Sequence, residues 1–375
     1  MIHFRHEIVC AIVTTQIVDP FDQVSITAPA LDAGRLRNLP AIEWPTLALL
    51  IATYGIWAAG TSVVYAWSPV LAIVLTGVMI AQHSSLQHET LHGHPFRARW
   101  LSELVVTPGL TLTVPFGRFR DVHLAHHHDP HLTDPYDDPE SNYLDPVVWV
   151  TLPRFVQLVL LINNTLAGRI VIGPIIGGAL WLRGEARLIL AGDRAVIRDW
   201  GLHVLGLVPV AAWLWVVAMP WWAYLLAAWI GHGLLKIRTY LEHRAHDLCR
   251  GRSVIVEDRG PFALLFLNNN FHAVHHAHPQ VPWYRLPAFY AAQRAQFVQR
   301  NNGYVYQSYA QIFRAHFLRT KDPVAHPLMG PDQVMRRNVG TSPELSKNGT
   351  PGCTPPARII ATSARTTSVM NGRSR

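Results

Sequence analysis

The sequence predicts an all-α integral membrane protein in which four transmembrane helices form two hairpins beneath a helical, water-facing cap. Half of the 375 residues are hydrophobic, only 15% are charged, and 13 are tryptophan. Four apolar segments approach the roughly 20 residues that a membrane-spanning helix requires. They occur in two pairs, and each pair has a proline at its turn. This pairing predicts the two hairpins.

The N-terminal residues 1–43 are mixed and polar, so we expect a cytoplasmic arm there and no cleaved signal peptide. The two hairpins follow, and neither turn carries a charged residue. The four predicted spans are Pro45–Trp67, Pro69 to about Gln87, Trp200–Met219 and Pro220–Ile237.

Two shorter apolar stretches lie between the hairpins, Leu101–Pro115 and Ile170–Leu182. Both are rich in glycine and proline, and we interpret them as interfacial or re-entrant segments, with the alternative that one of them spans. We assign residues 44–338 to one membrane domain. The last segment, 339–375, lacks apolar periodicity and is rich in Ser, Thr, Pro, Gly and Arg, which predicts a disordered tail.

The distribution of basic residues predicts the orientation. The net charge of +8 could attract nucleic acid, but the apolar segments make a membrane the better explanation, and we expect no nucleic-acid partner. Because basic residues collect on the cytoplasmic side, the segment between the hairpins and both termini should be cytoplasmic, beside the inner membrane if the protein is bacterial. The arginines between the hairpins are Arg97, Arg99, Arg118, Arg120, Arg154, Arg183, Arg187, Arg194 and Arg198.

Histidine is unusually abundant, with 21 residues, and most of the chemistry is expected where it clusters. Residues three or four apart lie on one face of a helix, so the members of each cluster can be directed at a common point. A weaker pair, His243 and His246, follows the fourth predicted span. The three main clusters, or boxes, are His88 with His92, His123 with His126 and His127, and His272 with His275 and His276.

Imidazole binds iron, copper and zinc, so these boxes predict a metal site. Their eight histidines exceed what one ion can use, whereas two six-coordinate ions with open positions can accommodate them. If both hairpins cross the membrane and return, all three boxes emerge at one membrane face. The sequence therefore predicts a binuclear centre.

The boxes resemble those of the membrane fatty acid desaturase superfamily, which includes desaturases, hydroxylases and ketolases. The shared pattern is HxxxH, HxxHH and HxxHH, with further similarity at His88–Gly93, Asn270–His276 and Pro282–Pro287, over roughly residues 45–290. The resemblance implies two non-haem iron ions and O₂ as co-substrate. It implies as ligands His88, His92, His123, His126, His127, His243, His272, His275 and His276.

Several further residues are candidates around that centre. His83, His246 and Asn268 are alternative ligands, because each lies within a few residues of a box or of His243. Carboxylates that accept the second N–H of a ligating histidine fix its tautomer. The acidic run after the second box could do this, and the expected residues are Asp129, Asp134, Asp137 and Asp138.

The activity that the resemblance implies is O₂-dependent oxidation of a C–H bond in lipid metabolism, with no catalytic residue beyond the metal ligands. Fatty acyl desaturation is favoured over hydroxylation by a monooxygenase acting on an alkane, a carotenoid or a smaller catabolic substrate. Three cysteines are too few for a four-Cys iron–sulfur cluster, so electrons should come from an external ferredoxin, rubredoxin or cytochrome.

Two rivals come from other classes. The HExxH motif at 88–92 could serve a membrane zinc protease in which Glu89 is the general base. A zinc site of that kind needs only one further ligand, so at least five box histidines would have no role. A metal transporter is the second rival, and it would consume no O₂.

Overall fold

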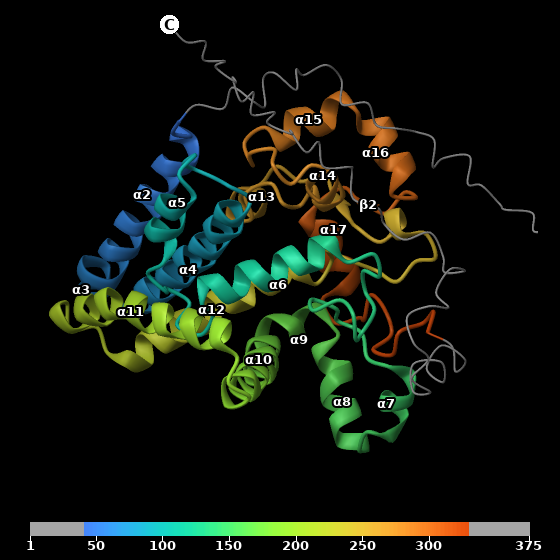
Figure 1. Cartoon of the computed structure of the whole chain (residues 1–375), viewed down its shortest axis with the longest axis horizontal. Coiled ribbons are helices and arrows are strands. Elements are labelled where there is room, and N and C mark those ends of the chain that lie inside the picture. The colour runs from blue at the N-terminus through green and yellow to red at the C-terminus, as the bar shows by residue number, and fades with distance from the viewer. Residues whose placement is uncertain (1–40, 330–375) are drawn as a thin grey trace, which may run out of the picture.

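The computed structural model describes residues 41–329 and is mostly helical, as predicted (Figure 1). The first half contains α2 (Trp44–Ala59), the π-helical η1 (Gly60–Val64), α3 (Tyr65–Trp67), α4 (Pro69–Leu91), α5 (Arg99–Val106), α6 (Phe116–His128), α7 (Pro146–Thr151), α8 (Arg154–Asn163), α9 (Leu166–Val171) and α10 (Gly173–Leu190). The second half contains α11 (Arg194–Val216), α12 (Trp221–Thr239), η2 (Cys249–Gly251), β1 (Ile255–Val256), α13 (Pro261–Leu265), α14 (His272–Ala277), α15 (Leu286–Ala292), α16 (Arg294–Arg300), β2 (Val305–Tyr306) and α17 (Tyr309–His316).

Three helices of the described residues are long and apolar enough to cross a membrane: Trp44–Trp67, Pro69–Leu91 and Arg194–Val216. They correspond to the first three predicted spans, although the third begins at Arg194 rather than Trp200. The fourth predicted span is the helix α12, but it is more polar because it contains His232, Lys236 and Arg238. Three of the four predicted spans are therefore confirmed as long apolar helices, and a fourth crossing remains a prediction.

The two helical turns lie at the same end of the bundle, on the left of Figure 1. Hydrogen bonds join them: the Trp213 indole N–H donates to Thr61 Oγ1 at 2.9 Å, and the Trp57 indole N–H donates to the Tyr224 hydroxyl at 3.3 Å. These aromatic residues bury the polar ends of their rings between the helices. The pairs α2–α4 and α11–α12 are thus packed as one bundle.

The helices α4 and α12 make the most extensive contact in the fold. They cross where two glycines face each other: a Cβ on Gly77 would lie 2.8 Å from Ile230 Cγ2, and one on Gly231 would lie 2.8 Å from Ile80 Cγ2. Glycine permits this close approach because it has no side chain. The crossing fixes the last turn of α4 relative to the end of α12, where histidines of the predicted site occur.

Both short apolar stretches are partly helical, and their interfacial or re-entrant placement stays a prediction. Residues 101–115 form most of α5 followed by an irregular turn, and residues 170–182 belong to the end of α9 and to the longer helix α10.

Residues 41–43 pack on the segment after the first box, where the Glu43 N–H donates to Pro95 O at 2.9 Å. The rest of the predicted arm, and the predicted tail at 339–375, lie outside the described residues.

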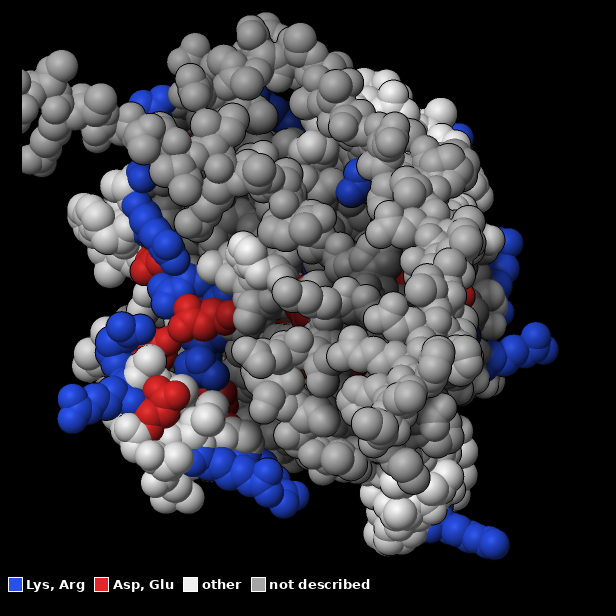
Figure 2. Space-filling view, turned by 45° about the vertical axis from the view of Figure 1, so that its right-hand side comes forward, with Lys and Arg blue, Asp and Glu red and all other residues white. Residues whose placement is uncertain are grey.

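The cap is built from α13 to α17 and the short parallel pair β1–β2. Its core includes the buried Phe271, Val274, Leu286 and Phe297, so α14 is packed against α15 and α16. Figure 2 shows acidic and basic side chains together at the left of this face and further basic side chains at its right edge, whereas the lowest part of the molecule is largely white, the colour of uncharged residues.

Candidate metal centre

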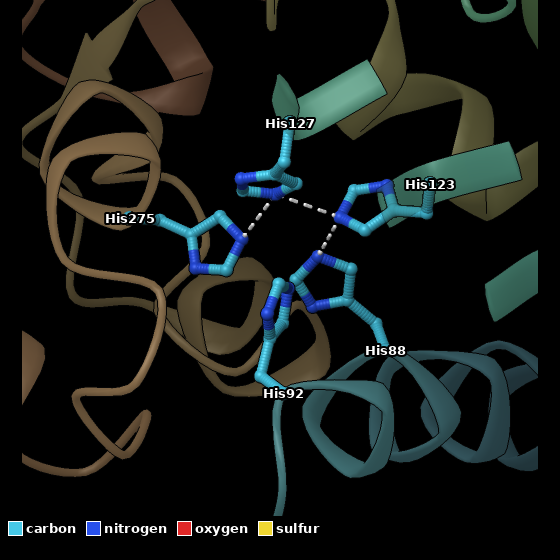
Figure 3. Close-up of side chains that lie close together, drawn as sticks. All are labelled: His88, His92, His123, His127 and His275. Carbon is cyan, nitrogen blue, oxygen red and sulfur yellow. Dashed lines mark hydrogen bonds between the residues drawn. The ribbon is translucent and has the colours of Figure 1, made fainter. Parts of the chain in front are cut away.

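The structure brings nine histidines into two neighbouring clusters. The first cluster, drawn in Figure 3, consists of His88, His92, His123, His127 and His275. The second cluster consists of His126, His243, His272 and His276. Within each cluster the candidate ligand atoms all lie within 4.8 Å of one another. All nine residues that the sequence singled out as ligands are found here.

Helix geometry explains how the boxes are divided. Histidines four apart share a cluster, as His123 and His127 do on α6 and His272 and His276 do on α14. In the second and third boxes the remaining histidine joins the other cluster, His126 the second cluster and His275 the first. Residues one apart on a helix point in different directions, so the adjacent histidines of the second and third boxes cannot converge on a single point. The expectation that all histidines of one box are directed at a common point therefore holds for the first box but not for the second and third.

A largely buried ion pair holds α6 in place over the neighbouring helices. The Arg118 guanidinium donates to both carboxylate oxygens of Glu185 on α10, at 2.8 and 3.0 Å. The Trp200 indole N–H of α11 donates to the same carboxylate at 2.9 Å. A bidentate arginine–carboxylate pair fixes orientation as well as distance. The second box is thereby anchored to the bundle.

The Nε2 atoms within each cluster face one another. In the first, His123 Nε2 lies 3.0 Å from that of His88 and 2.9 Å from that of His127. Figure 3 shows these rings, with those of His92 and His275, directed at a common centre. In the second cluster, His243 Nε2 lies 2.9 Å from that of His126 and 3.0 Å from that of His272.

These contacts cannot all be hydrogen bonds. His123 Nδ1 lies 2.9 Å from Glu140 Oε1, and His126 Nδ1 lies 2.7 Å from Asp138 Oδ1. A carboxylate accepts, so each Nδ1 carries a hydrogen, and an imidazole that holds no second proton presents a lone pair at Nε2. His123 Nε2 then faces two other Nε2 atoms with one lone pair. A cation at the centre is what satisfies such converging lone pairs.

The separations also fit a particular coordination geometry. For nitrogen ligands about 2.1 Å from a metal, two ligands at 90° lie about 3.0 Å apart, and two at the tetrahedral angle lie about 3.4 Å apart. The closest Nε2 pairs lie 2.9 to 3.1 Å apart. His92 Nε2 is buried and has no hydrogen-bond partner among the described residues, as expected of a ligand atom. The residues therefore fit octahedral ions better than tetrahedral ones.

Burial and charge keep most of these imidazoles neutral. Burial, followed by repulsion from neighbouring imidazoles, lowers the pKa of His127, His275 and His276 well below the ordinary value. For His126, burial also opposes the charged form, but Glu140 and Asp138 outweigh it and raise the pKa to about 9. Positive charge is thus favoured beside these two carboxylates.

The three alternative ligands lie outside both clusters. His83 is buried in α4, and its Nε2 lies 2.9 Å from the Tyr54 hydroxyl. His246 accepts a hydrogen bond at Nε2 from the Asn302 amide at 2.9 Å. Asn268 donates its amide to Trp283 O at 3.0 Å. Each therefore has a local partner, and none of the three shares the converging geometry.

Of the four acidic residues expected to support the ligands, Asp138 does so through His126. Asp129 and Asp134 accept hydrogen bonds from backbone N–H groups of their own loop, and Asp137 lies 3.5 Å from His131. Glu140, further along the same acidic run, faces His123.

Sequence reasoning missed two residues beside the third box. Asn269 Oδ1 lies 3.2 Å from His272 Nδ1, and Glu242 Oε1 lies 3.6 Å from the same atom. Glu242 is held by Arg238 at 2.8 Å. The available signal was that Glu242 directly precedes His243 and that Asn269 lies three residues before His272.

Glu89 is not placed as a protease base would be. One of its carboxylate oxygens accepts the Trp283 N–H at 2.8 Å and lies 3.9 Å from His94 Nε2. His94 Nδ1 in turn lies 2.7 Å from Glu43 Oε1. The buried group Glu43–His94–Glu89 ties the start of α2, the first box and the segment after the third box together.

These features define a class: a helical membrane protein with two histidine clusters suited to metal ions. The family model for fatty acid desaturases matches residues 65–308, a range that includes all nine clustered histidines. The chain belongs to the fatty acid desaturase family. It is accordingly an oxidoreductase, and a lipid is the substrate class that the family implies. A search of curated proteins gave no match. Family membership and the two clusters leave the zinc protease without support.

Proposed function

We propose that the protein is a membrane non-haem di-iron oxygenase that uses O₂ to oxidise a C–H bond of a lipid or hydrocarbon. The observation that carries this proposal is that nine histidine rings converge on two neighbouring points. Nitrogen-rich sites with near-octahedral spacing suit iron better than zinc, which prefers four tetrahedral ligands.

The chain would hold one ion with five histidines and the other with four. For six-coordinate ions, this leaves more open positions at the second cluster. Bound iron would supply the activation of O₂ that C–H oxidation requires. Glu140, Asp138 and Asn269 would fix the orientation of His123, His126 and His272, and burial of the rings would exclude water.

Fatty acyl desaturation is the favoured reaction, and hydroxylation of an alkane, a carotenoid or a smaller catabolic substrate is the alternative. Desaturation removes two neighbouring hydrogens and sends both oxygen atoms into water, whereas hydroxylation places one oxygen atom in the product. Either reaction consumes electrons, which we assign to an external ferredoxin, rubredoxin or cytochrome.

The proposed topology has four spans in two hairpins, with α12 as the fourth. Both hairpin turns lie at one end of the bundle, and the histidine clusters lie toward the other. We place the clusters, the cap and both termini on the cytoplasmic side, because the arginines between the hairpins follow the positive-inside rule. The domain would extend over 44–338.

The test is product analysis with labelled oxygen. Iron-loaded protein in detergent is given ¹⁸O₂, a reducing ferredoxin system and a panel of acyl lipids, alkanes and carotenoids. We expect an unlabelled alkene from desaturation, or a labelled alcohol from hydroxylation, and neither from His126→Ala. If the protein carries its full iron content and consumes no O₂ with any substrate, the proposal is wrong and a metal-binding or transport role gains support.

A further inference from the structure

The helical hairpin α7–α8 exposes a continuous apolar surface that no predicted span includes. Relative exposure reaches 70% for Val150, 71% for Phe155 and 58% for Leu158. Arg154 is the one charged residue between 146 and 163. Exposed apolar surface of this kind on a folded protein marks contact with a membrane or with another protein. The other exposed apolar residues of the hairpin are Val147, Val148, Val159, Leu161 and Ile162.

On α8 four of the five exposed apolar residues form a single stripe, and Leu161 lies beside it. Phe155, Leu158, Val159 and Ile162 follow i, i+3, i+4 and i+7 spacing, which places them on one face. Gln157 lies on the other side, where it is half-buried. A helix of ten residues is about 15 Å long and cannot cross a core of about 30 Å. A stripe along its length suits a helix that lies in the plane of the membrane.

The polar groups of the hairpin turn are satisfied internally. The Gln157 amide donates to Trp149 O at 3.1 Å and to Leu152 O at 3.0 Å. The Thr151 hydroxyl donates to Val148 O at 2.8 Å. In water the carbonyls at the end of a short helix are readily hydrated, whereas in lipid they need partners from the protein. This turn provides those partners.

The end of α8 shows on which side of the membrane the hairpin lies. The Asn164 amide donates to Asp322 O at 2.6 Å, and the Tyr240 hydroxyl donates to Asn164 O at 3.3 Å. Tyr240 lies directly after α12 and three residues before His243. The helix α9 continues along α12, where the Trp229 indole N–H donates to Val171 O at 3.0 Å. The hairpin is therefore fixed at the metal-cluster end of the bundle.

We infer that α7–α8 is an in-plane membrane anchor that lies in the leaflet nearest the metal clusters, with its apolar stripe among the acyl chains. In Figure 1 the hairpin projects below the rest of the fold, and in Figure 2 the lowest part of the molecule is uncoloured except for basic atoms at its edge. Arg154 lies beside the stripe, where it can reach lipid phosphates while its stem stays in contact with the acyl region. This inference does not depend on the identity of the metal.

The experiment is photocrosslinking of the full chain in lipid nanodiscs. Benzoylphenylalanine replaces Phe155 or Leu158, and in the control it replaces Gln299, an exposed polar residue of α16. All three positions are exposed, so the substitutions do not disturb the core. Because the stripe is placed among acyl chains, lipid adducts at positions 155 and 158 should exceed those at 299 by about tenfold or more.

Adducts are identified by mass spectrometry. Crosslinks from 155 and 158 to a second copy of the chain would overturn the inference in favour of a dimer contact. Crosslinks to another segment of the same chain would do so in favour of an internal cover. Lipid adducts no more abundant than at 299 would also refute it. A metal count on the same samples is independent of all these outcomes, so failure here is distinct from failure of the proposed function.

Discussion

Replacing Asp138 with asparagine should weaken metal binding at the second cluster. The carboxylate lies 2.7 Å from His126 Nδ1, and both side chains are almost fully buried. Asp138 also accepts the Thr133 N–H at Oδ2, at 2.8 Å, and the Glu140 N–H at Oδ1, at 2.9 Å. Asparagine has one acceptor oxygen and cannot serve all three donors. If the NH2 of the asparagine faces His126, Nδ1 of that ring must accept a hydrogen bond. The ring hydrogen then lies on Nε2, which cannot bind a metal.

The expected loss is about 10- to 100-fold in metal affinity, which corresponds to about 1.4 to 2.7 kcal/mol. It is measured by competition with an iron chelator, followed by mass spectrometry of the retained metal. The control is Asp137→Asn, since Asp137 is half-exposed and lies 3.5 Å from His131. Unchanged retention in Asp138→Asn, or an equal loss in Asp137→Asn, would refute the reasoning.

Three further predictions concern packing, charge and ligand choice. Gly77→Leu should destabilise the fold by about 1–3 kcal/mol, because a Cβ there meets Ile230 Cγ2 at 2.8 Å. The control Gly55→Leu should not destabilise it, because nothing lies within 4 Å of a Cβ at that position, and thermal unfolding of the two variants makes the comparison. Arg238→Gln should lower the free energy of unfolding by about 3–5 kcal/mol, because it leaves the buried Glu242 without its partner. In the same assay Arg99→Gln, which breaks the more exposed pair with Glu103, should lower it by about 0–1 kcal/mol. His83→Gln should keep the full metal content, since His83 faces Tyr54, and loss of a metal ion in this variant would show that His83 is a ligand after all.

The histidine boxes were predictable because their chemistry is local. Spacing of three and four residues identifies a helical face, and nine ligand candidates could be named from it together with the family resemblance. How His126 separates from His127, and His275 from His276, depends on where α6 and α14 lie between the clusters, which is a tertiary property. Spacing alone does not contain that information.

Other features depend on contacts distant in sequence. Glu43 is 51 residues from His94, and Glu89 is 194 residues from Trp283, so no local pattern predicts either contact. The helices α7 and α8 are each too short to span a membrane, so a search for apolar segments of about 20 residues does not find them. The helix α12 was predicted from its apolar residues, but His232, Lys236 and Arg238 reduce its hydropathy.

Two metal ions, rather than one, should be bound by the two histidine clusters. The most direct test is a metal count by mass spectrometry on purified wild-type protein, His126→Ala and the control His246→Ala. We expect about two iron ions per chain in the wild type and in His246→Ala, and fewer in His126→Ala, because His126 contributes one of four histidines to the second cluster. One zinc ion per chain, unaffected by His126→Ala, would contradict the account.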